Sequence, residues 1–325
     1  MKDNGIILGI DTSNYTTSLA VVTADGELQK NIKVPLPVKE GEVGLRQSDA
    51  VFSHTKNLPV AFARADGIIK NCELLAVGVS ECPRDAEGSY MPCFLAGVAA
   101  ATAVSESVGC ALYKSSHQAG HIMAAMYSSG MLDDYKDKGG RFISFHVSGG
   151  TTEMLLCEKN ENGISAEIIG KTNDLNAGQA VDRCGVMLGC RFPCGPEIER
   201  LACEYYKNNG RIRGFGVSVS GLDCNLSGLE NLARKTYAES DDAGRTSAFV
   251  LEYIAKTLIK MTDAATERYG SLPLLYAGGV MSNGIIKERI REKYARAYFA
   301  LPEHSSDNAV GAALLAREKH LKAKE

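Results

Sequence analysis

His117 and His121 are two of only six histidines in this 325-residue chain, and they stand four residues apart. On an α-helix that spacing places both imidazoles on one face, one turn above the other. Two neutral imidazoles so arranged can share one divalent cation of the zinc or iron kind. A pair of ordinary helix-face histidines is the alternative at this spacing alone. Gln118 stands where paired-histidine metalloproteases carry a Glu as general base, so the pair indicates a metal site and argues against a peptidase.

Two loops rich in glycine and hydroxyl side chains could hold phosphate. Residues 11–18 (DTSNYTTS) connect two short apolar runs, and residues 148–152 (SGGTT) connect two more. Each predicts a β-hairpin whose loop offers hydroxyl and backbone N–H donors to an anion, and paired glycines let the backbone approach a ligand. A polar hairpin without function is the alternative for either loop alone. The repetition indicates a duplicated architecture with a nucleotide between the two halves.

A third glycine pair follows a predicted strand over 272–277. Residues 278–283 (GGVMSN) separate that strand from a predicted helix over 284–294, which would place backbone near a ligand at a helix N-terminus. The sequence fits neither the phosphate-binding G-x-x-x-x-G-K-[ST] loop nor the G-x-G-x-x-G dinucleotide fingerprint. Two hairpin loops followed by a late Gly-Gly turn are typical of actin-like ATPase folds, such as those of sugar kinases and chaperone ATPases.

Other elements must position these groups. We expect a helix over 54–70, a strand over 74–79, a small-residue helix over 91–104 and a charged link over 132–141. A chain of this length fits two domains of ordinary size, and 45% apolar with 23% charged residues is typical of a soluble globular protein. The apolar helix is too short to span a membrane, and the run over 5–10 is too short for the core of a signal sequence.

The net charge bears on whether the protein binds nucleic acid, and the cysteine content bears on the cellular compartment. The net charge of −3 and the pI near 6.1 give no overall electrostatic footprint for nucleic acid, so RNA binding would need a local basic patch. Ten cysteines occur without a CxxC pair, and such scattered thiols are typical of a reduced cytosolic protein. We therefore expect a cytoplasmic protein with no membrane segment.

Eight short motifs, in one order along the chain, resemble those of a single family. They are 9–13 (GIDTS), 117–121 (HQAGH), 147–150 (VSGG), 177–182 (AGQAVD), 193–196 (PCGP), 219–222 (VSGL), 278–283 (GGVMSN) and 306–308 (SDN). On these residues the sequence is identified as a divergent member of the Kae1/TsaD family. The resemblance implies an α/β fold of two RNase H-like lobes, of the actin-like ATPase (ASKHA) superfamily, with an interlobe cleft. We expect one lobe to comprise residues 1–116 and 300–325, and the other to comprise 117–299.

The resemblance also implies roles for individual residues. One divalent metal ion, iron or zinc, would be held by His117, His121 and Asp307. Asp11, the acidic residue of the first motif, would be catalytic. A second set of residues would contact ATP, ADP or threonylcarbamoyl-AMP. It comprises Ser148, Gly149, Gly150, Thr151, Asp182, Gly195 and Asn283. Asp182 would bind the ribose.

Members of this family transfer a threonylcarbamoyl group from threonylcarbamoyl-AMP to N6 of adenosine 37 in tRNA. This acyltransferase activity, a step of t6A biosynthesis, is the expected function. The expected partners are tRNA and accessory t6A-synthesis proteins of the TsaB and TsaE kinds, with a homodimer or a heterodimer left open. The alternative is a nucleotide- and metal-binding regulatory paralogue, or a carbamoyl-type transferase that acts on a substrate other than tRNA.

Three positions depart from the family pattern where phosphate and RNA would bind. Thr151 replaces a histidine, the segment that begins at Asn14 replaces an acidic run, and Asp223 replaces a basic residue. Because an Asp does not suit RNA phosphates, we expect altered RNA recognition beside retained metal and ribose contacts. The nearest basic cluster is Arg211 with Arg213, and we predict that it supplies a weak, salt-sensitive tRNA-binding surface. A solvated loop with no ligand is the alternative.

Overall fold

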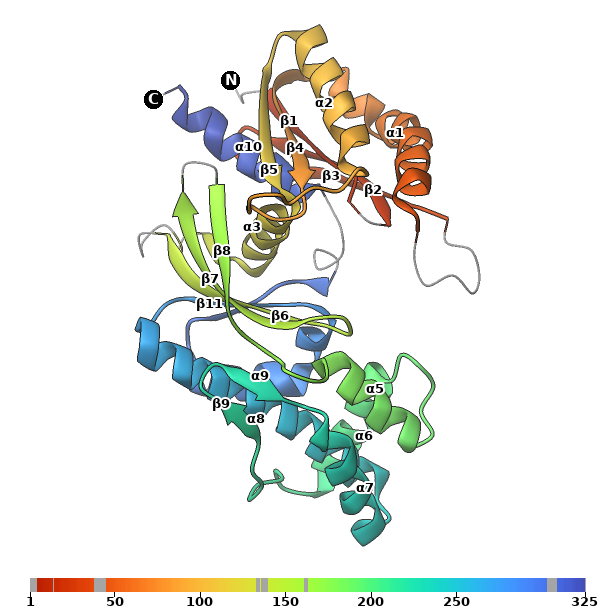
Figure 1. Ribbon diagram of the computed structural model, residues 1–325, viewed down its shortest axis with the longest axis vertical. Helices are drawn as coiled ribbons and strands as arrows, with labels where there is room; N and C mark the ends of the chain where they lie inside the picture. The colour runs from red at the N-terminus through yellow and green to blue at the C-terminus, as the bar shows by residue number, and fades with distance from the viewer. Residues whose placement is uncertain are drawn as a thin grey trace. The chain divides into compact units, whose positions relative to one another are not determined.

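The computed structural model (Figure 1) describes residues 5–13, 15–37, 45–132, 135, 140–160, 163–302 and 309–324. Asn14 and Asp307 therefore lie outside the described residues. The chain forms two compact units: unit 1 comprises residues 1–127, 159–166 and 304–325, and unit 2 comprises residues 128–158 and 167–303. The lobe bounds and the cleft expected from the sequence stay predictions.

Unit 1 is built on a five-stranded mixed sheet with the spatial order β3-β2-β1-β4-β5. Its strands are β1 (Gly5–Asp11), β2 (Thr16–Thr23), β3 (Leu28–Pro35), β4 (Glu73–Cys82) and β5 (Ala111–Ser116). Neighbours among the first three strands pair antiparallel, whereas β4 and β5 run parallel to β1. The central strand β1 is buried along its whole length, which explains its nearly unbroken apolar sequence. The predicted first hairpin is thus confirmed.

The described residues also include the helices α1 (Gln47–Ile69), α2 (Phe94–Val108), α3 (His117–Ser129) and α10 (Val310–Lys322). Helix α10 comes from the far end of the chain and packs against β1, β4 and β5. A Cβ at Gly9 would lie 2.3 Å from Ala309 O, and one at Gly78 would lie 2.2 Å from Ala312 O. Helix and sheet approach this closely only because both strand residues lack a side chain.

A second sheet, of order β12-β11-β6-β7-β8, repeats the arrangement and belongs to unit 2 except for the part of β7 and β8 within residues 159–166. Its strands are β6 (Arg141–Val147), β7 (Thr152–Asn160), β8 (Gly163–Lys171), β11 (Leu274–Ala277) and β12 (Ala297–Phe299). As in unit 1, the first hairpin is antiparallel, and the two strands that follow in space run parallel to the hairpin's first strand. The second predicted hairpin and the duplicated α/β architecture are therefore confirmed.

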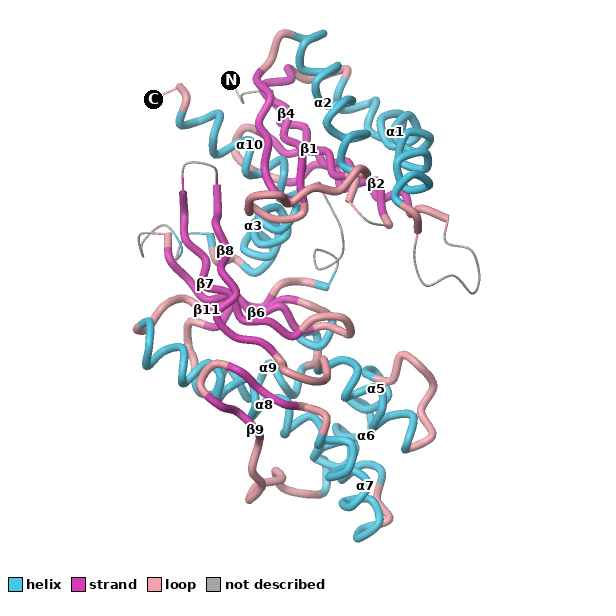
Figure 2. The backbone as a smooth tube through the Cα atoms, in the orientation of Figure 1, coloured by secondary structure: helices cyan, strands magenta, loops and turns pink. Residues whose placement is uncertain are grey.

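The helices of unit 2 gather around one long central helix, α8 (Figure 2). The set comprises α5 (Ala177–Met187), α6 (Gly195–Asn208), α7 (Gly228–Ser240), α8 (Ala243–Tyr269), the 3₁₀ turn η1 (Gly279–Ser282) and α9 (Gly284–Lys293). A small hairpin of β9 (Ser218–Ser220) and β10 (Asp223–Asn225) lies between α6 and α7 in the chain. Each of the other α-helices contacts α8, so α8 is buried on several sides and fixes their spacing.

Some elements differ from their predicted bounds. Helix α1 begins at Gln47 rather than residue 54, and α2 begins at Phe94 rather than residue 91. Strand β5 was not predicted, because its sequence ALYKSS mixes polar and apolar residues at a sheet edge and lacks the alternation of a half-buried strand. Within the described ranges no helix combines the length and apolar character needed to cross a membrane.

Candidate functional site

The two histidines of unit 1 lie at the start of helix α3. His117 is the first residue of the helix, and His121 follows one turn later. Their ring centroids are 4.3 Å apart, and the ring planes cross at 80°. The end of β5 directly precedes the helix, so the sheet fixes where the first imidazole lies. The arrangement brings two imidazoles to one place, which is the donor type that zinc and iron accept.

Asp11, the last residue of the central strand β1, binds the first of these imidazoles. Its Oδ2 lies 2.8 Å from His117 Nδ1, and its Oδ1 accepts hydrogen bonds from Ser13 N–H at 2.9 Å and from Ser13 Oγ at 2.5 Å. Burial would raise the pKa of Asp11, which is 1% exposed, but the His117 imidazole and Ser13 lower this pKa to about 2. An ionised Asp11 holds the proton on Nδ1 and so makes Nε2 the nitrogen that can ligate a metal.

The donor set fits a metal site as far as the structure describes it. Two imidazoles, one of them oriented by a carboxylate, are the usual partial ligand set of a transition metal. The third predicted ligand, Asp307, lies outside the described residues. Within those residues, no group of three His, Cys, Asp or Glu side chains could hold an ion. A complete site therefore needs a ligand from elsewhere, and Asp307 stays the predicted one.

The glycine turn of unit 2 is anchored to the start of α5. Ser148 N–H donates to Thr151 O at 2.7 Å, and the amides of Gly150 and Thr151 lie 3.3 and 3.1 Å from Ser148 Oγ. Gly178 N–H donates to Ser148 O at 3.1 Å. A Cβ at Gly178 would lie 2.7 Å from the backbone of Gly149, so only glycine permits this approach of helix to turn. The turn is thereby held in a fixed position.

A pocket of about 320 Å³ lies beside this turn, within unit 2. That volume is within the range of small-molecule sites. Four of the residues predicted to contact a nucleotide line it: Gly149, Asp182, Gly195 and Asn283. The other three, Ser148, Gly150 and Thr151, do not line it but belong to the same turn as Gly149. Apolar walls come from Val181, Leu251 and Ile286, on the helices α5, α8 and α9.

Asp182 and Asn283 each have one side-chain atom hydrogen-bonded to the protein backbone and a second polar atom that can bind a ligand. Asp182 Oδ1 accepts a hydrogen bond from Cys194 N–H at 2.8 Å, and its second oxygen can accept one from a ribose hydroxyl. Asn283 Oδ1 accepts a hydrogen bond from Ile286 N–H at 3.0 Å and so caps α9. Its amide nitrogen is then the atom that can donate to a ligand. A Cβ at Gly195 would meet no atom within 4 Å, so open space lies over this residue.

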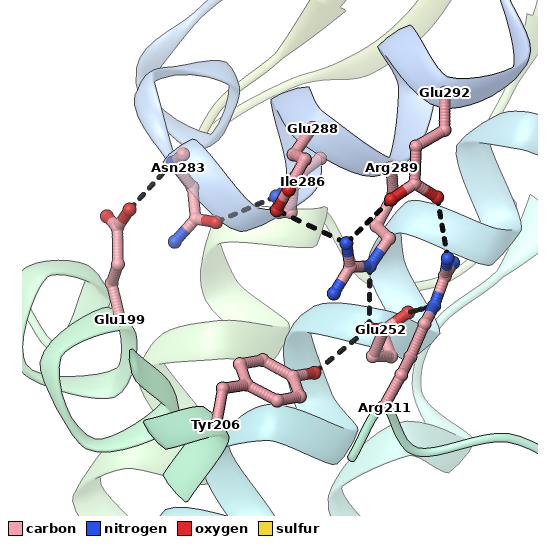
Figure 3. A network of polar contacts seen from close by, with 10 residues as sticks. Glu199, Tyr206, Arg211, Glu252, Asn283, Ile286, Glu288, Arg289 and Glu292 are labelled. Carbon is pink, nitrogen blue, oxygen red and sulfur yellow. Dashed lines mark hydrogen bonds and ion pairs between the residues drawn. The ribbon is translucent and has the colours of Figure 1, made fainter. Parts of the chain in front are cut away.

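Glu199 is a pocket residue that sequence reasoning missed. It extends from α6, and its Oε1 accepts a hydrogen bond at 2.7 Å from the N–H of Gly284, the first residue of α9 (Figure 3). No helix was predicted over these residues, and a single carboxylate gives no signal of its own in a sequence. With Asp182, Glu199 gives the pocket two carboxylates. Among the described residues that line the pocket there is no Lys or Arg, so the pocket suits a nucleoside better than a phosphate chain.

Arg211, which was predicted to help bind RNA, is paired with protein carboxylates. Its Nε lies 3.0 Å from Glu252 Oε2 and its Nη1 lies 2.7 Å from Glu292 Oε2 (Figure 3). Glu252 is 2% exposed and also binds Arg289 Nε at 2.8 Å and Tyr206 Oη at 2.9 Å. Arg211 therefore neutralises buried protein carboxylate, which argues against a main role in binding RNA phosphate. The neighbouring Arg213 is exposed, and its RNA role stays a prediction.

Asp223, which replaces a basic residue of the family, has a structural task. Its Oδ1 accepts a hydrogen bond from Lys171 N–H at 2.8 Å and so joins the β9–β10 hairpin to the end of β8. A Cβ at Gly170 would lie 2.3 Å from Leu222 O, which shows how closely the two segments approach. The carboxylate serves this junction, and a Lys or Arg at position 223 could not accept that hydrogen bond.

Comparison with known proteins gives one consistent description. The family model for TsaD, tRNA N6-adenosine threonylcarbamoyltransferase, matches residues 48–314. A protein of that name from Kosmotoga olearia is 30% identical, with 96% of this chain and 93% of that protein covered. One from Bacillus cereus is 30% identical over 91% and 84% of the two chains, and one from Methanopyrus kandleri is 27% identical over 93% and 84%.

Solved structures extend the comparison to the fold. Full-length HypF in its phosphate- and nucleotide-bound form matches with a TM-score of 0.58 at 11% identity, over 98% of this chain and 56% of that one. Component A of the (R)-2-hydroxyglutaryl-CoA dehydratase of Acidaminococcus fermentans matches with a TM-score of 0.51 at 14% identity, over 97% and 99%. At such identities the likeness concerns the fold alone, and the predicted actin-like ATPase fold is confirmed.

Proposed function

The chain belongs to the TsaD family of tRNA N6-adenosine threonylcarbamoyltransferases, and from this premise we propose a role for each of its two sites. It is an enzyme that transfers a threonylcarbamoyl group to tRNA in t6A biosynthesis. The main support for these roles is the pocket of unit 2. Asp182, Gly195 and Asn283 come from motifs far apart in the chain and line one cavity.

The pocket of unit 2 would hold the adenosine part of threonylcarbamoyl-AMP. Val181, Leu251 and Ile286 offer apolar walls to a base, and Asp182 accepts a hydrogen bond from the ribose. Gly195 leaves room for the nucleoside because it has no side chain. The turn that contains Gly149 would lie toward the phosphate. ATP or ADP would compete for the same pocket through the same adenosine contacts.

The site of unit 1 would hold one divalent ion, iron or zinc, through His117, His121 and Asp307. A bound ion would supply a Lewis acid that polarises the threonylcarbamoyl carbonyl or orients its carboxylate. Asp11 fixes the tautomer and orientation of His117, so we assign the predicted catalytic residue Asp11 a positioning role. In the transfer, the N6 amine of the tRNA adenosine forms the new C–N bond, the bond to AMP breaks, and the amine loses a proton.

Removing the Asp11 carboxylate should weaken metal binding. We expect Asp11→Asn to lower the affinity for Zn²⁺ by about 10- to 100-fold, the usual effect of losing a partner of a metal-ligating histidine. Titration calorimetry with Zn²⁺ measures this without any substrate. His117→Ala should lose more, because it removes a ligand. Ser13→Ala is the matched control, since it removes one hydrogen bond to Asp11 but keeps the carboxylate beside His117. Equal affinities for wild type and Asp11→Asn would contradict the positioning role.

Acid should destabilise unit 1 through the same carboxylate. The pKa of Asp11 is lowered from 3.8 to about 2, so the folded state binds this proton more weakly than the unfolded chain does. The stabilisation is complete above pH of about 4 and is lost as the pH falls toward about 2. Thermal midpoints of the chelator-treated protein between these values should fall more steeply for wild type than for Asp11→Asn. Parallel profiles would contradict the lowered pKa.

The transferase assignment is tested with the purified chain, tRNA transcripts and an enzymatic source of threonylcarbamoyl-AMP. We propose that TsaB- and TsaE-like accessory proteins assist in the cytoplasm, where tRNA is modified, so the assay is run with and without them. We expect t6A in digested tRNA by mass spectrometry. Adenylate binding without t6A under both conditions would favour a regulatory paralogue instead.

A further inference from the structure

The connection between α5 and α6 carries an exposed aromatic side chain at the rim of the pocket. Phe192 is 76% exposed, although burial of a Phe normally stabilises a fold by about 1.5–3 kcal/mol. The next residue, Pro193, lines the pocket. Val186, the second-last residue of α5, is 59% exposed. A single exposed apolar residue is common on protein surfaces, so the charges around this ring must decide whether it has a partner.

Two arginines accompany this ring. Arg191 directly precedes Phe192, is exposed, and has no hydrogen-bond or ion-pair partner among the residues that the structure describes. Arg183 follows the pocket residue Asp182, and its side chain is 58% exposed. Its Nη1 is 3.9 Å from Glu230 Oε2, the limit for an ion pair. Both cations therefore face water rather than the protein.

The carboxylates nearby are already bound. Asp182 and Glu199 accept backbone N–H groups within the pocket. Glu197 and Glu204 are both paired with Arg200, at 2.7 and 2.6 Å. Glu230 accepts from Arg234 at 2.7 Å. Among the described residues, the exposed charges of this rim that lack a close ion-pair partner are therefore Arg191 and Arg183, whereas Asp182 and Glu199 keep their negative charge inside the pocket.

We propose that Phe192, Arg191 and Arg183 form a contact surface for the unpaired RNA that flanks the target adenosine. Unpaired RNA is recognised by stacking of its bases on aromatic rings and on arginine planes, with arginines also meeting phosphates. The surface replaces the predicted cluster around Arg211, which is occupied by protein carboxylates. The inference rests on the proposed function, because it assigns this surface to the tRNA substrate of that function.

The test compares tRNA affinities by fluorescence anisotropy at several salt concentrations. Phe192→Ala should weaken binding about 5- to 150-fold, the range for loss of one stacked base, and Phe192→Trp should retain it. Arg191→Ala should weaken binding and reduce the magnitude of the salt slope by about 0.7, the value for one phosphate of a single strand. Arg213→Ala, on the competing loop, should change neither quantity. Adenylate affinity should stay at the wild-type value in all four variants.

The outcomes separate this surface from the proposed function. If wild type makes t6A but both Phe192→Ala and Arg191→Ala bind tRNA normally, the surface is wrong and the function stands. Loss of affinity in Arg213→Ala alone would place the RNA on the loop after α6 and overturn the proposal. Rim variants that lose an accessory protein but keep tRNA affinity would show a protein interface instead. If wild type neither binds tRNA nor makes t6A, the proposed function fails, and the surface fails with it.

Discussion

Replacing Gly195 by Leu is expected to prevent nucleotides from binding in the pocket of unit 2. The residue lines the pocket of unit 2, and a Cβ there would meet no atom within 4 Å. The leucine side chain therefore enters open space without disturbing the fold, and it takes the volume that the nucleoside needs. We expect the dissociation constant for ATP to rise at least about 100-fold, equivalent to about 2.7 kcal/mol. Titration calorimetry of the purified variant measures it.

Two variants make this experiment interpretable. Gly195→Ala adds one methyl group at the same position and should lower the affinity much less than leucine does. Gly210→Leu introduces the same side chain on the loop after α6, at a glycine that does not line the pocket and whose Cβ would also meet nothing within 4 Å. It should bind ATP like wild type. Wild-type affinity in Gly195→Leu would show that the nucleotide binds elsewhere.

Removal of the Glu252 carboxylate is expected to cause the largest loss of stability. The side chain on α8 receives bonds from Tyr206 on α6, from Arg289 on α9 and from Arg211 (Figure 3). The side chains of Glu252 and Arg289 are only 3% and 10% exposed. Glu252→Ala removes the buried partner of Arg289, whose side chain is 10% exposed, and the exposed Glu292 compensates that charge only in part. We expect the free energy of unfolding to fall by about 3–5 kcal/mol.

Glu292→Ala is the matched control for that substitution. Glu292 belongs to the same network and binds both arginines, at 2.7 and 3.0 Å, but its side chain is 47% exposed. Exposed ion pairs contribute about 0–1 kcal/mol, so its loss should be small. Urea unfolding monitored by circular dichroism compares the two variants. Equal losses for both would mean that burial does not decide the strength of this network.

The elements that could be predicted from the sequence are those with a distinctive local pattern of residues. The two hairpins and the Gly-Gly turn were found because glycine and hydroxyl loops interrupt apolar runs, and the pairing of β1 with β2 and of β6 with β7 bears this out. The fold class followed from their repetition. Strand β5 escaped prediction because an edge strand keeps polar residues and has no clear period.

The residues that sequence reasoning misplaced depend on contacts far along the chain. Arg211 looked like an available cation because its neutralising partner, Glu252, is 41 residues away and inside α8. Glu199 was missed because its partner, Gly284, is 85 residues away in the sequence. The predicted metal and nucleotide residues came from a family resemblance, which carries such long-range information without revealing the contacts behind it.

The close packing of α10 against β1 and β4 bears on the order in which the chain can fold during synthesis. Unit 1 takes its sheet from the first part of the chain and α10 from a segment made after all of unit 2. Until that helix leaves the ribosome, Gly9 and Gly78 lie on an uncovered sheet face. Domains generally fold as units in order of synthesis, but here unit 2 can finish first. The nascent protein would then need protection from aggregation at its earliest strands for the longest time.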